Sequence, residues 1–427
     1  SIYYINLSQD EFKLGGSSFA QTLNKIGNDV PTIKDSNFFK KAFNTVQELI
    51  KDSQIVAGHD IGSGGLITTL LEMCFADVNL GAKIDFSVFE EKDIIKYLFA
   101  ENIGIVFQAK DDAVLENKLN QNNVSFYKLG TVTTDEKLNF GPCGLDIPKY
   151  RKIWFETSFL LDQKQTANNK AQERFENFDK QELKYKFPTQ FTGKKPEIDL
   201  SKPKPKAAII REKGSNSERE MANAMFLAGF DVKDIHMTDL ISGRENLEDI
   251  QFIGAVGGFS NSDVLGSAKG WAGAFLYNEK ANTALKNFFK REDTLSVGIC
   301  NGCQLFMELE LINPEHEVHG KMKHNDSQKH ESGFSSVTIQ ENNSVMLKTL
   351  AGSTLGVWIS HGEGKFNLPN TEDQYNIVAK YAYEGYPANP NGSDFNTAMM
   401  CDKTGRHLVM MPHIERSTFP WNWAYYP

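Results

Sequence analysis

The sequence predicts an α/β domain built on a parallel sheet in the C-terminal half, preceded by an α+β domain. Three observations support this fold class. The chain has 427 residues, more than one ordinary core holds at roughly 150 residues per domain. A stretch rich in lysine and proline lies near residues 194–206. Beyond it, short apolar runs alternate with amphipathic segments, the pattern of parallel strands joined by crossover helices.

The N-terminal part, expected to span residues 1–160, mixes helix and strand signals. A glycine-rich turn at 14–18 precedes a helix predicted near 37–52. A second glycine-rich segment, His59 to Leu66, opens a helix that is expected to end near Phe75. Strands are predicted near 83–88 and 103–108.

A helical and Lys/Pro-rich linker is expected at residues 161–206. Charged and amide-rich residues lead into Lys194-Lys195-Pro196 and then into alternating lysine and proline up to Lys206. Alternating proline excludes both a helix and a central strand, so this end of the linker is exposed and extended. The lysines could instead form an anion-binding patch, but charge runs are usually solvated, and we favour the linker.

The C-terminal part is expected to span residues 207–427. Its predicted strands are 207–210, 232–236, 252–256 and 295–299, and its predicted helices are 217–228, 281–290 and 301–312. From residue 335 onward the pattern changes to shorter strands with few helices. These strands are predicted at 336–340, 356–360 and 408–411.

The amino-acid composition argues against only a few broad classes of function. The net charge of -9 argues against a nucleic-acid or anionic-membrane partner, since both require a basic surface. Five cysteines scattered over a long chain do not form a disulfide framework, which favours a reducing cytoplasm. No run of about 18 apolar residues and no leader pattern occurs, so no membrane span or signal peptide is expected.

Cys300 stands at a predicted strand-to-helix turn. The apolar run 295–299 ends directly at Cys300, and the helical pattern begins at Asn301. Such a turn exposes a side chain at the carboxyl edge of the sheet and points a helix N-terminus at it, which favours the thiolate. Gly298 and Gly302 permit a close backbone approach. The pattern therefore indicates a cysteine nucleophile.

The spacing of Cys300 and Cys303 also fits other interpretations. Structural zinc needs two further ligands, and only His316, His319 or His324 are near in sequence, at irregular spacing. A thioredoxin-like redox pair would leave a distant His413 unexplained. If Cys300 stood alone in the sequence, we would interpret the two cysteines as small residues that pack at the start of a helix.

Cys300 does not stand alone, because two other segments supply matching chemistry. An apolar strand ends at Pro412 and is followed by His413 and Glu415. A histidine at a strand end can take the thiol proton, and a nearby carboxylate can orient it and stabilise the imidazolium. A third strand runs into Gly257-Gly258, whose N–H groups can face a carbonyl oxygen under attack.

Together these blocks, Gly257-Gly258, residues 298–304 (GICNGCQ) and residues 412–415 (PHIE), resemble the class I glutamine amidotransferases. The resemblance implies a flavodoxin-like parallel sheet and hydrolysis of glutamine through a glutamyl thioester. It assigns Cys300 as nucleophile, His413 as base and Glu415 as its partner. It also implies that Gly258 and Asn301 supply oxyanion-hole N–H groups and that Gln304 borders the glutamine pocket.

Further sequence segments, distributed over the whole chain, resemble a narrower family. The segments 211–218, 257–266, 360–364 (SHGEG) and 386–393 resemble the large, single-chain phosphoribosylformylglycinamidine synthases of purine biosynthesis. The N-terminal segments 14–21, 59–66 and 98–104 resemble the second half of that family's synthetase region. The resemblance implies an ATP-dependent ligase that converts formylglycinamide ribonucleotide to its amidine with ammonia from glutamine.

Asp60 and Gly62 are the candidate ligand residues of the N-terminal part. A glycine-rich turn can bring N–H groups to a phosphate, and Asp60 can hold Mg²⁺ that bridges nucleotide oxygens. The resemblance implies an ATP and magnesium site here, with Gly62 on the nucleotide. Gly62 and Ser63 depart from the family's usual His-Asp-x-Ser-Asp-Gly-Gly pattern, and Gly333 stands where relatives often have arginine.

Family members are much longer, and this chain begins at Ser1, so a C-terminal fragment is expected whose partner is the missing N-terminal part of the same polypeptide. Such a fragment is expected to keep the glutaminase residues without completing synthesis. Two rival interpretations stay open at this point. One is another cysteine hydrolase or peptidase on the same scaffold, and the other is a noncatalytic scaffold protein.

Overall fold

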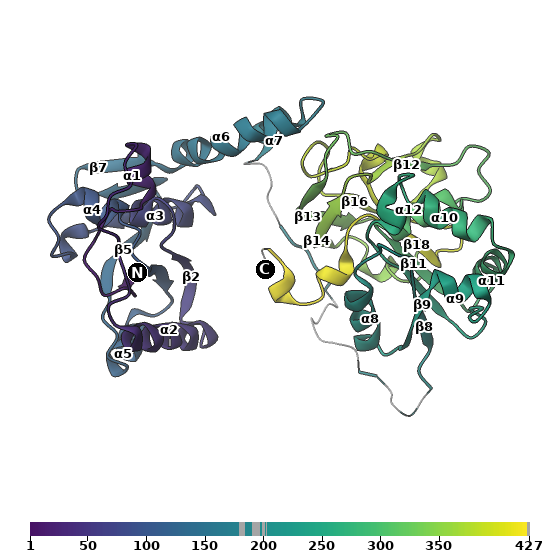
Figure 1. Ribbon diagram of the computed structural model, residues 1–427, viewed down its shortest axis with the longest axis horizontal. Coiled ribbons are helices and arrows are strands. Elements are labelled where there is room, and N and C mark those ends of the chain that lie inside the picture. Colours follow the sequence, from purple (N-terminus) through teal and green to yellow (C-terminus); the bar gives the residue numbers. More distant parts are fainter. Residues whose placement is uncertain (179–183, 190–196, 199–200, 202, 425–427) are drawn as a thin grey trace. The chain divides into compact units, whose positions relative to one another are not determined.

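A computed structural model describes residues 1–178, 184–189, 197–198, 201 and 203–424 (Figure 1). The chain divides into two compact units, Ser1–Ser158 and Phe159–Pro427. Much of the predicted Lys/Pro-rich linker, including Lys194, Lys195 and Pro196, lies outside the described residues, as do the last three residues of the chain. No described helix is both long enough and apolar enough to cross a membrane.

The first unit is built on a seven-stranded sheet in the order β2-β4-β1-β5-β3-β6-β7. Every neighbouring pair is antiparallel except β3 and β6. A mainly antiparallel sheet is the α+β arrangement that the sequence predicts. The strands are β1 (Ile2–Asn6), β2 (Ile55–Asp60), β3 (Gly81–Ile84), β4 (Gly104–Ala109), β5 (Tyr127–Thr133), β6 (Lys137–Phe140) and β7 (Cys143–Asp146).

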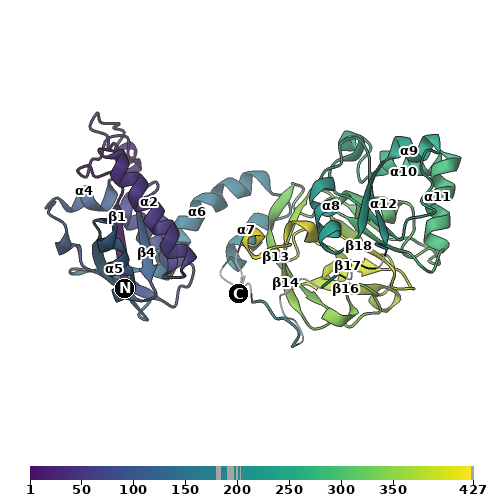
Figure 2. The ribbon, with the colours of Figure 1, turned by 90° about the horizontal axis from the view of Figure 1, so that it is seen from below.

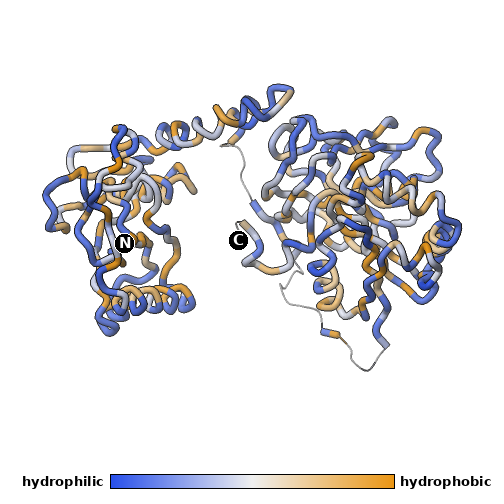
Figure 3. The backbone as a smooth tube through the Cα atoms, in the orientation of Figure 1, coloured by the Kyte–Doolittle hydropathy of each residue, from blue (hydrophilic) through white to orange (hydrophobic). Residues whose placement is uncertain are grey.

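Helices cover both faces of this sheet because successive side chains of a strand point to opposite sides. In β1, Tyr3 and Ile5 pack in one cluster with α2 and α5, whereas Ile2 and Tyr4 pack in another with α3 and α4. Figure 3 shows α2 alternating between polar and apolar residues, as a helix with one buried face requires. The helices are α1 (Ser18–Thr22), α2 (Ser36–Lys51), α3 (Gly65–Phe75), α4 (Ile94–Phe99) and α5 (Asp112–Gln121).

Two helices occupy the region of the expected domain boundary. Helix α6 (Ile147–Gln165) runs through residue 160, where the sequence places the end of the first domain, without a break. Helix α7 (Lys170–Asn177) follows after a short turn. Its Arg174 pairs with Glu331 at 2.9 Å, so α7 packs within the second unit.

The second unit contains a nine-stranded sheet in the order β14-β13-β16-β17-β18-β11-β10-β8-β9. The five strands from β18 to β9 are mutually parallel, and the remaining pairs are antiparallel. These strands are β8 (Lys206–Arg211), β9 (Asp231–His236), β10 (Phe252–Ala255), β11 (Leu295–Ile299), β13 (Glu331–Ile339), β14 (Thr354–His361), β16 (Asn376–Tyr381), β17 (Thr397–Cys401) and β18 (His407–Met410); β12 (Lys321–Lys323) and β15 (Lys365–Asn367) form a separate pair.

Crossover helices enclose the parallel half. Both views place α8 on one side of the strands and α9 and α11 on the other (Figure 1 and Figure 2). The helices are α8 (Glu218–Leu227), α9 (Met237–Ser242), α10 (Lys269–Leu276), α11 (Glu279–Lys290) and α12 (Asn301–Glu308). The predicted parallel sheet with crossover helices is thus confirmed for this half of the unit.

Two predicted elements are wrong at their ends. Helix α12 stops at Glu308 and not near residue 312, because Glu310 takes a left-handed φ of 59° and the Leu311 N–H bonds back to the carbonyl of Phe306. The strand expected to reach residue 88 ends at Ile84, because Asp85 caps a short 3-10 turn through its side chain.

Gly302 lets α12 pack directly on the sheet, which leads to a stability prediction. A Cβ at this position would collide with the backbone carbonyl of Ala255 in β10, and neither backbone can move away easily. We expect Gly302→Ala to lower the free energy of unfolding by about 1–3 kcal/mol. Gly333→Ala is the matched control, since no atom lies within 4 Å of its Cβ position. Chemical denaturation of both variants tests this, and equal stabilities would contradict it.

Candidate active site

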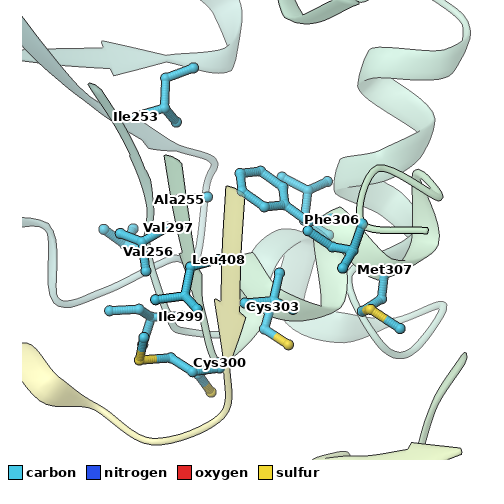
Figure 4. Packing of buried hydrophobic residues seen from close by; sticks show 14 of the residues in the cluster. Ile253, Ala255, Val256, Val297, Ile299, Cys300, Cys303, Phe306, Met307 and Leu408 are labelled. Carbon is cyan, nitrogen blue, oxygen red and sulfur yellow. The ribbon is translucent and has the colours of Figure 1, made fainter. Parts of the chain in front are cut away.

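Cys300 occupies the sharp turn between β11 and α12. Its backbone has φ 51° and ψ -104°, a strained conformation for a residue with a side chain. The Cys300 N–H donates a 2.8 Å hydrogen bond to the carbonyl of Met410 at the end of the neighbouring β18. Figure 4 shows the buried side chains that surround this turn, among them Ile299 and Leu408. The turn is therefore fixed to the neighbouring strand β18.

His413 reaches the same edge of the sheet from β18. Its N–H donates a 2.8 Å hydrogen bond to the carbonyl of Trp358 in β14, which fixes the backbone just beyond the strand. The ring Nδ1 lies 2.6 Å from Oε1 of Glu415, and both side chains are buried. An ionised carboxylate only accepts hydrogen bonds, so Nδ1 carries the hydrogen and Nε2 is left for another partner.

The imidazole ring of His413 lies next to Cys300. Gly257 separates them: a Cβ there would lie 2.8 Å from Cε1 of His413 and 3.5 Å from Cβ of Cys300. Burial lowers the pKa of His413, but hydrogen bonds to Cys300 and Glu415 and the charges of both groups outweigh it and raise the pKa to about 9. The thiol also lies 3.6 Å from the carbonyl of Ser360. The imidazolium form of His413 is therefore favoured at neutral pH.

Two backbone N–H groups adjoin the thiol. Gly258, with φ 115°, is flanked by hydrogen bonds from Phe259 to Gly214 at 2.9 Å and from Asn216 to Gly257 at 2.8 Å. Neither bond uses the N–H of Gly258 itself. Asn301 is the first residue of α12, so its N–H has no acceptor within the helix. Both groups can serve as donors to an oxyanion.

A pocket of about 230 Å³ opens onto Cys300. Gln304 forms part of its wall, and its Nε2 donates to the carbonyl of Glu363 at 2.8 Å. The side chain of Asn301 supports Gln304: its Nδ2 donates to Oε1 of Gln304 at 2.8 Å, and its Oδ1 accepts from the N–H of Ser260 at 3.1 Å. The wall is formed by Asn216, Gly258, Phe259, Asp263, Cys300, Gln304, His324, Gln328, Lys329, His330, Ser360, His361, Gly362, Glu363, His413 and Arg416.

Cys303 does not share the environment of Cys300. It is fully buried, and burial raises the pKa of its thiol well above the ordinary value. Both cysteines are free thiols. Among the described residues no cluster of three or more His, Cys, Asp or Glu side chains could hold a metal ion. The geometry thus favours a single reactive thiol over a zinc site or a redox pair.

The candidate ligand residues of the first unit are less enclosed. Asp60 ends β2, and its carboxylate is 88% exposed, 3.6 Å from Nδ1 of His59. Gly62 has open space where a side chain would stand. In the same loop the N–H of Gly64 donates to Oε1 of Glu101 at 2.8 Å, so one donor expected to meet a phosphate already has a carboxylate partner.

Sequence reasoning missed several residues of the pocket wall. Asp263, His361 and Glu363 lie in segments noted only as family markers, Arg416 was noted only as the end of the segment that holds His413, and Lys329 was not noted. A usable signal existed for two of them: His361 closes β14 and Glu363 follows in a glycine-flanked turn, the same strand-end position that singled out His413.

Comparisons with known proteins give consistent results. A family model described as CobB/CobQ-like glutamine amidotransferase domain matches residues 204–427, and one described as AIR synthase related protein, C-terminal domain, matches residues 7–141. Two curated proteins are each 36% identical to the whole chain: the probable chloroplastic/mitochondrial phosphoribosylformylglycinamidine synthase of Arabidopsis thaliana and phosphoribosylformylglycinamidine synthase of Homo sapiens.

These alignments cover 32% and 34% of the two curated proteins, so the chain spans about a third of the length of the relatives it matches. Among solved structures, PurLQS from Thermotoga maritima is 23% identical, with a TM-score of 0.42. That match covers 52% of this chain and 92% of the Thermotoga chain.

Proposed function

We propose that this chain, which belongs to the family of CobB/CobQ-like glutamine amidotransferases, hydrolyses glutamine to glutamate and ammonia at Cys300. Its homology over the whole length to phosphoribosylformylglycinamidine synthases supports the same assignment. The proposed glutaminase domain comprises residues 207–427, which follow the linker at 161–206 and the synthetase-type domain at 1–160.

In the proposed reaction, the Cys300 thiolate attacks the side-chain amide carbon of glutamine. The N–H groups of Gly258 and Asn301 receive the developing oxyanion. The His413 imidazolium gives its proton to the leaving nitrogen, which departs as ammonia, and a thioester remains. Neutral His413 then takes a proton from water as the water oxygen attacks the thioester carbon. The C–S bond breaks, which leaves the Cys300 thiolate beside the His413 imidazolium as at the start, and the new carboxyl group of glutamate releases its proton to solvent.

One observation carries this proposal: His413 is hydrogen-bonded to Glu415 at 2.6 Å and to Cys300, and its pKa is raised to about 9 by them. By contrast, the buried His361 has its pKa lowered to about 3, mainly through burial. The pairing of nucleophile, base and carboxylate is therefore specific to His413.

For the whole protein we propose the role of phosphoribosylformylglycinamidine synthase, an ATP-dependent ligase. Ammonia from Cys300 would serve the amidination of formylglycinamide ribonucleotide, with ATP bound in part by the first unit. Asp60 and Gly62 are the proposed magnesium and nucleotide residues. One exposed carboxylate does not make an all-protein magnesium site, so Asp60 would hold the ion only together with nucleotide phosphates.

The test is to incubate the protein with glutamine and measure glutamate and ammonia, then to label it with an alkylating glutamine analogue. We expect equimolar products and a label that peptide mapping places on Cys300. Glutamine should protect against labelling. If the protein instead cleaves peptides and leaves free glutamine intact, the glutaminase assignment is wrong and a cysteine peptidase is supported.

A further inference from the structure

The turn between α6 and α7 lies against a loop on the wall of the pocket beside Cys300. This loop, residues 324–330, joins β12 to β13, and four of its residues line the pocket: His324, Gln328, Lys329 and His330. The two family models cover residues 7–141 and 204–427, so neither includes the turn or its helices. Part of the pocket wall therefore contacts a segment that lies outside the matched amidotransferase domain.

Two hydrogen bonds join this turn to the loop. The N–H of Ala167 donates to the carbonyl of Ser327 at 2.9 Å. The side-chain amide of Asn168 donates to the carbonyl of Asp326 at 2.7 Å. Ser327 is fully buried, and a buried carbonyl without a donor is unfavourable, so the turn stabilises the loop in its observed position.

Asp162, near the end of α6, holds the loop at a third point. Its carboxylate is buried, and one oxygen accepts from Nζ of Lys329 and from the hydroxyl of Thr166. Arg174 of α7 donates to the other oxygen at 2.9 Å. Burial raises the pKa of Asp162, but the hydrogen bonds and the nearby positive charges outweigh burial and lower this pKa. An ionised, buried carboxylate is unfavourable without its cations, so Lys329 and Asp162 stay paired.

The turn is itself fixed to the body of the second unit through Arg174. Its Nη2 donates to Glu331 of β13 at 2.9 Å and to the hydroxyl of Tyr386, and its guanidinium carbon lies 4.7 Å from the centre of the Tyr386 ring. Glu331 and Tyr386 are both buried, and charge-assisted hydrogen bonds are stronger than neutral ones. The α6–α7 segment therefore gives the loop a fixed support.

The core of the second unit holds the start of the loop. The buried side chain of Asn325 donates to the carbonyls of His361 at 2.7 Å and Lys329 at 3.0 Å. It also accepts from the N–H of Gly364 at 3.0 Å. By contrast, the carbonyl of Ser327 and the ammonium of Lys329 are bonded to α6 and the turn that follows it. Release from the α6–α7 segment would therefore loosen the middle of the loop and leave its start in place.

We propose that the α6–α7 segment is a positioning element of the candidate active site: Asp162 and Asn168 hold the middle of loop 324–330 in place on the pocket wall, so that the affinity of the site for its substrate depends on them. Neither residue lines the pocket, so both act through the loop and not on the reacting atoms. The catalytic unit then begins within α6 and not at residue 204. This inference rests on the proposed glutaminase function and adds to it an element outside the matched domain.

The first test is steady-state glutamine hydrolysis by the full chain. We expect Asp162→Asn to raise KM for glutamine by about 10- to 100-fold and to change kcat by less than about 3-fold, because the loop shifts and the proposed triad does not. Asn168→Gly keeps the left-handed backbone of this position, φ 55°, and removes one hydrogen bond, so a smaller rise in KM is expected. Asp162→Glu keeps the charge beside Lys329 and should restore most of the lost affinity.

The second test needs no turnover. Iodoacetamide should alkylate Cys300 at least about 3-fold faster in Asp162→Asn than in the unsubstituted chain, because a loosened wall opens more often and admits the reagent. Peptide mapping assigns the label. Glu176→Gln is the matched control for both tests, since this exposed carboxylate lies on α7 and accepts from Gln172 of the same helix at 2.8 Å. It should leave both KM and the alkylation rate unchanged.

An unchanged KM in Asp162→Asn overturns the proposal, and so does an equal rise of KM in Glu176→Gln. A fall in kcat at constant KM would also overturn it, because partial unfolding removes active molecules without changing the affinity of the rest. If the unsubstituted chain does not hydrolyse glutamine, the proposed function fails and the alkylation rates decide alone. A faster rate in Asp162→Asn then supports the positioning role, and equal rates overturn it.

Discussion

Cys300→Ala is expected to lower kcat for glutamine hydrolysis by at least about 1000-fold, the scale on which a nucleophile contributes to a catalytic triad. The neighbouring thiol cannot take over its role, because Cys303 is fully buried and its raised pKa keeps it as a thiol. Glutamate release at saturating glutamine measures the effect. Binding of glutamine should persist, since Gln304 and Glu363 on the pocket wall are unchanged.

Cys303→Ala is the matched control for this prediction. It removes a thiol three residues along the chain, inside α12, and leaves the Cys300–His413 pair unchanged. We expect kcat within a few-fold of the unsubstituted protein, together with a modest loss of stability from the small cavity left in the core. Equal losses of activity in the two variants would indicate that both thiols act together, as in a redox pair, and would contradict a single nucleophile.

The parts of this site that were predictable are those encoded within a few residues. The apolar run that ends at Cys300, the glycines on either side and the strand that ends before His413 all follow from local steric and periodicity rules. Parallel strands then bring their carboxyl ends to one edge of the sheet, so the two residues meet although they lie far apart in sequence.

The remaining wall depends on contacts that no local pattern encodes. Glu363 reaches the pocket because the end of β14 lies against the chain just beyond β18, where Trp358 forms an isolated bridge with His413. In the first unit, the N–H of Gly64 donates to Glu101, which lies 37 residues away in the sequence. This N–H of the glycine-rich loop therefore already has an acceptor within the protein. Helix α6 crosses the expected boundary because residues 149–165 contain neither glycine nor proline, so that nothing in the sequence ends the helix at residue 160.

Glu415→Gln is expected to change both the rate and its pH dependence. The reaction needs protonated His413 to release ammonia, so kcat/KM should fall as pH rises through about 9, the pKa of His413. The Glu415 carboxylate raises that pKa through a hydrogen bond and its charge. The glutamine side chain introduced at position 415 keeps the hydrogen bond to His413 but carries no charge. The alkaline limb of the pH profile should therefore move to lower pH by about one unit or more.

The rate at neutral pH should fall as well, by about 100-fold or more. A neutral amide does not stabilise the imidazolium, and because it can either accept from Nδ1 or donate to it, its hydrogen bond does not select the Nδ1–H tautomer. The measurement is kcat/KM for glutamine across the alkaline range in both proteins. Glu220→Gln is the control: this exposed carboxylate lies 3.9 Å from Arg416, near the same strand end, and should leave the limb in place. A limb that stays near pH 9 in Glu415→Gln would mean that the titrating proton does not belong to His413.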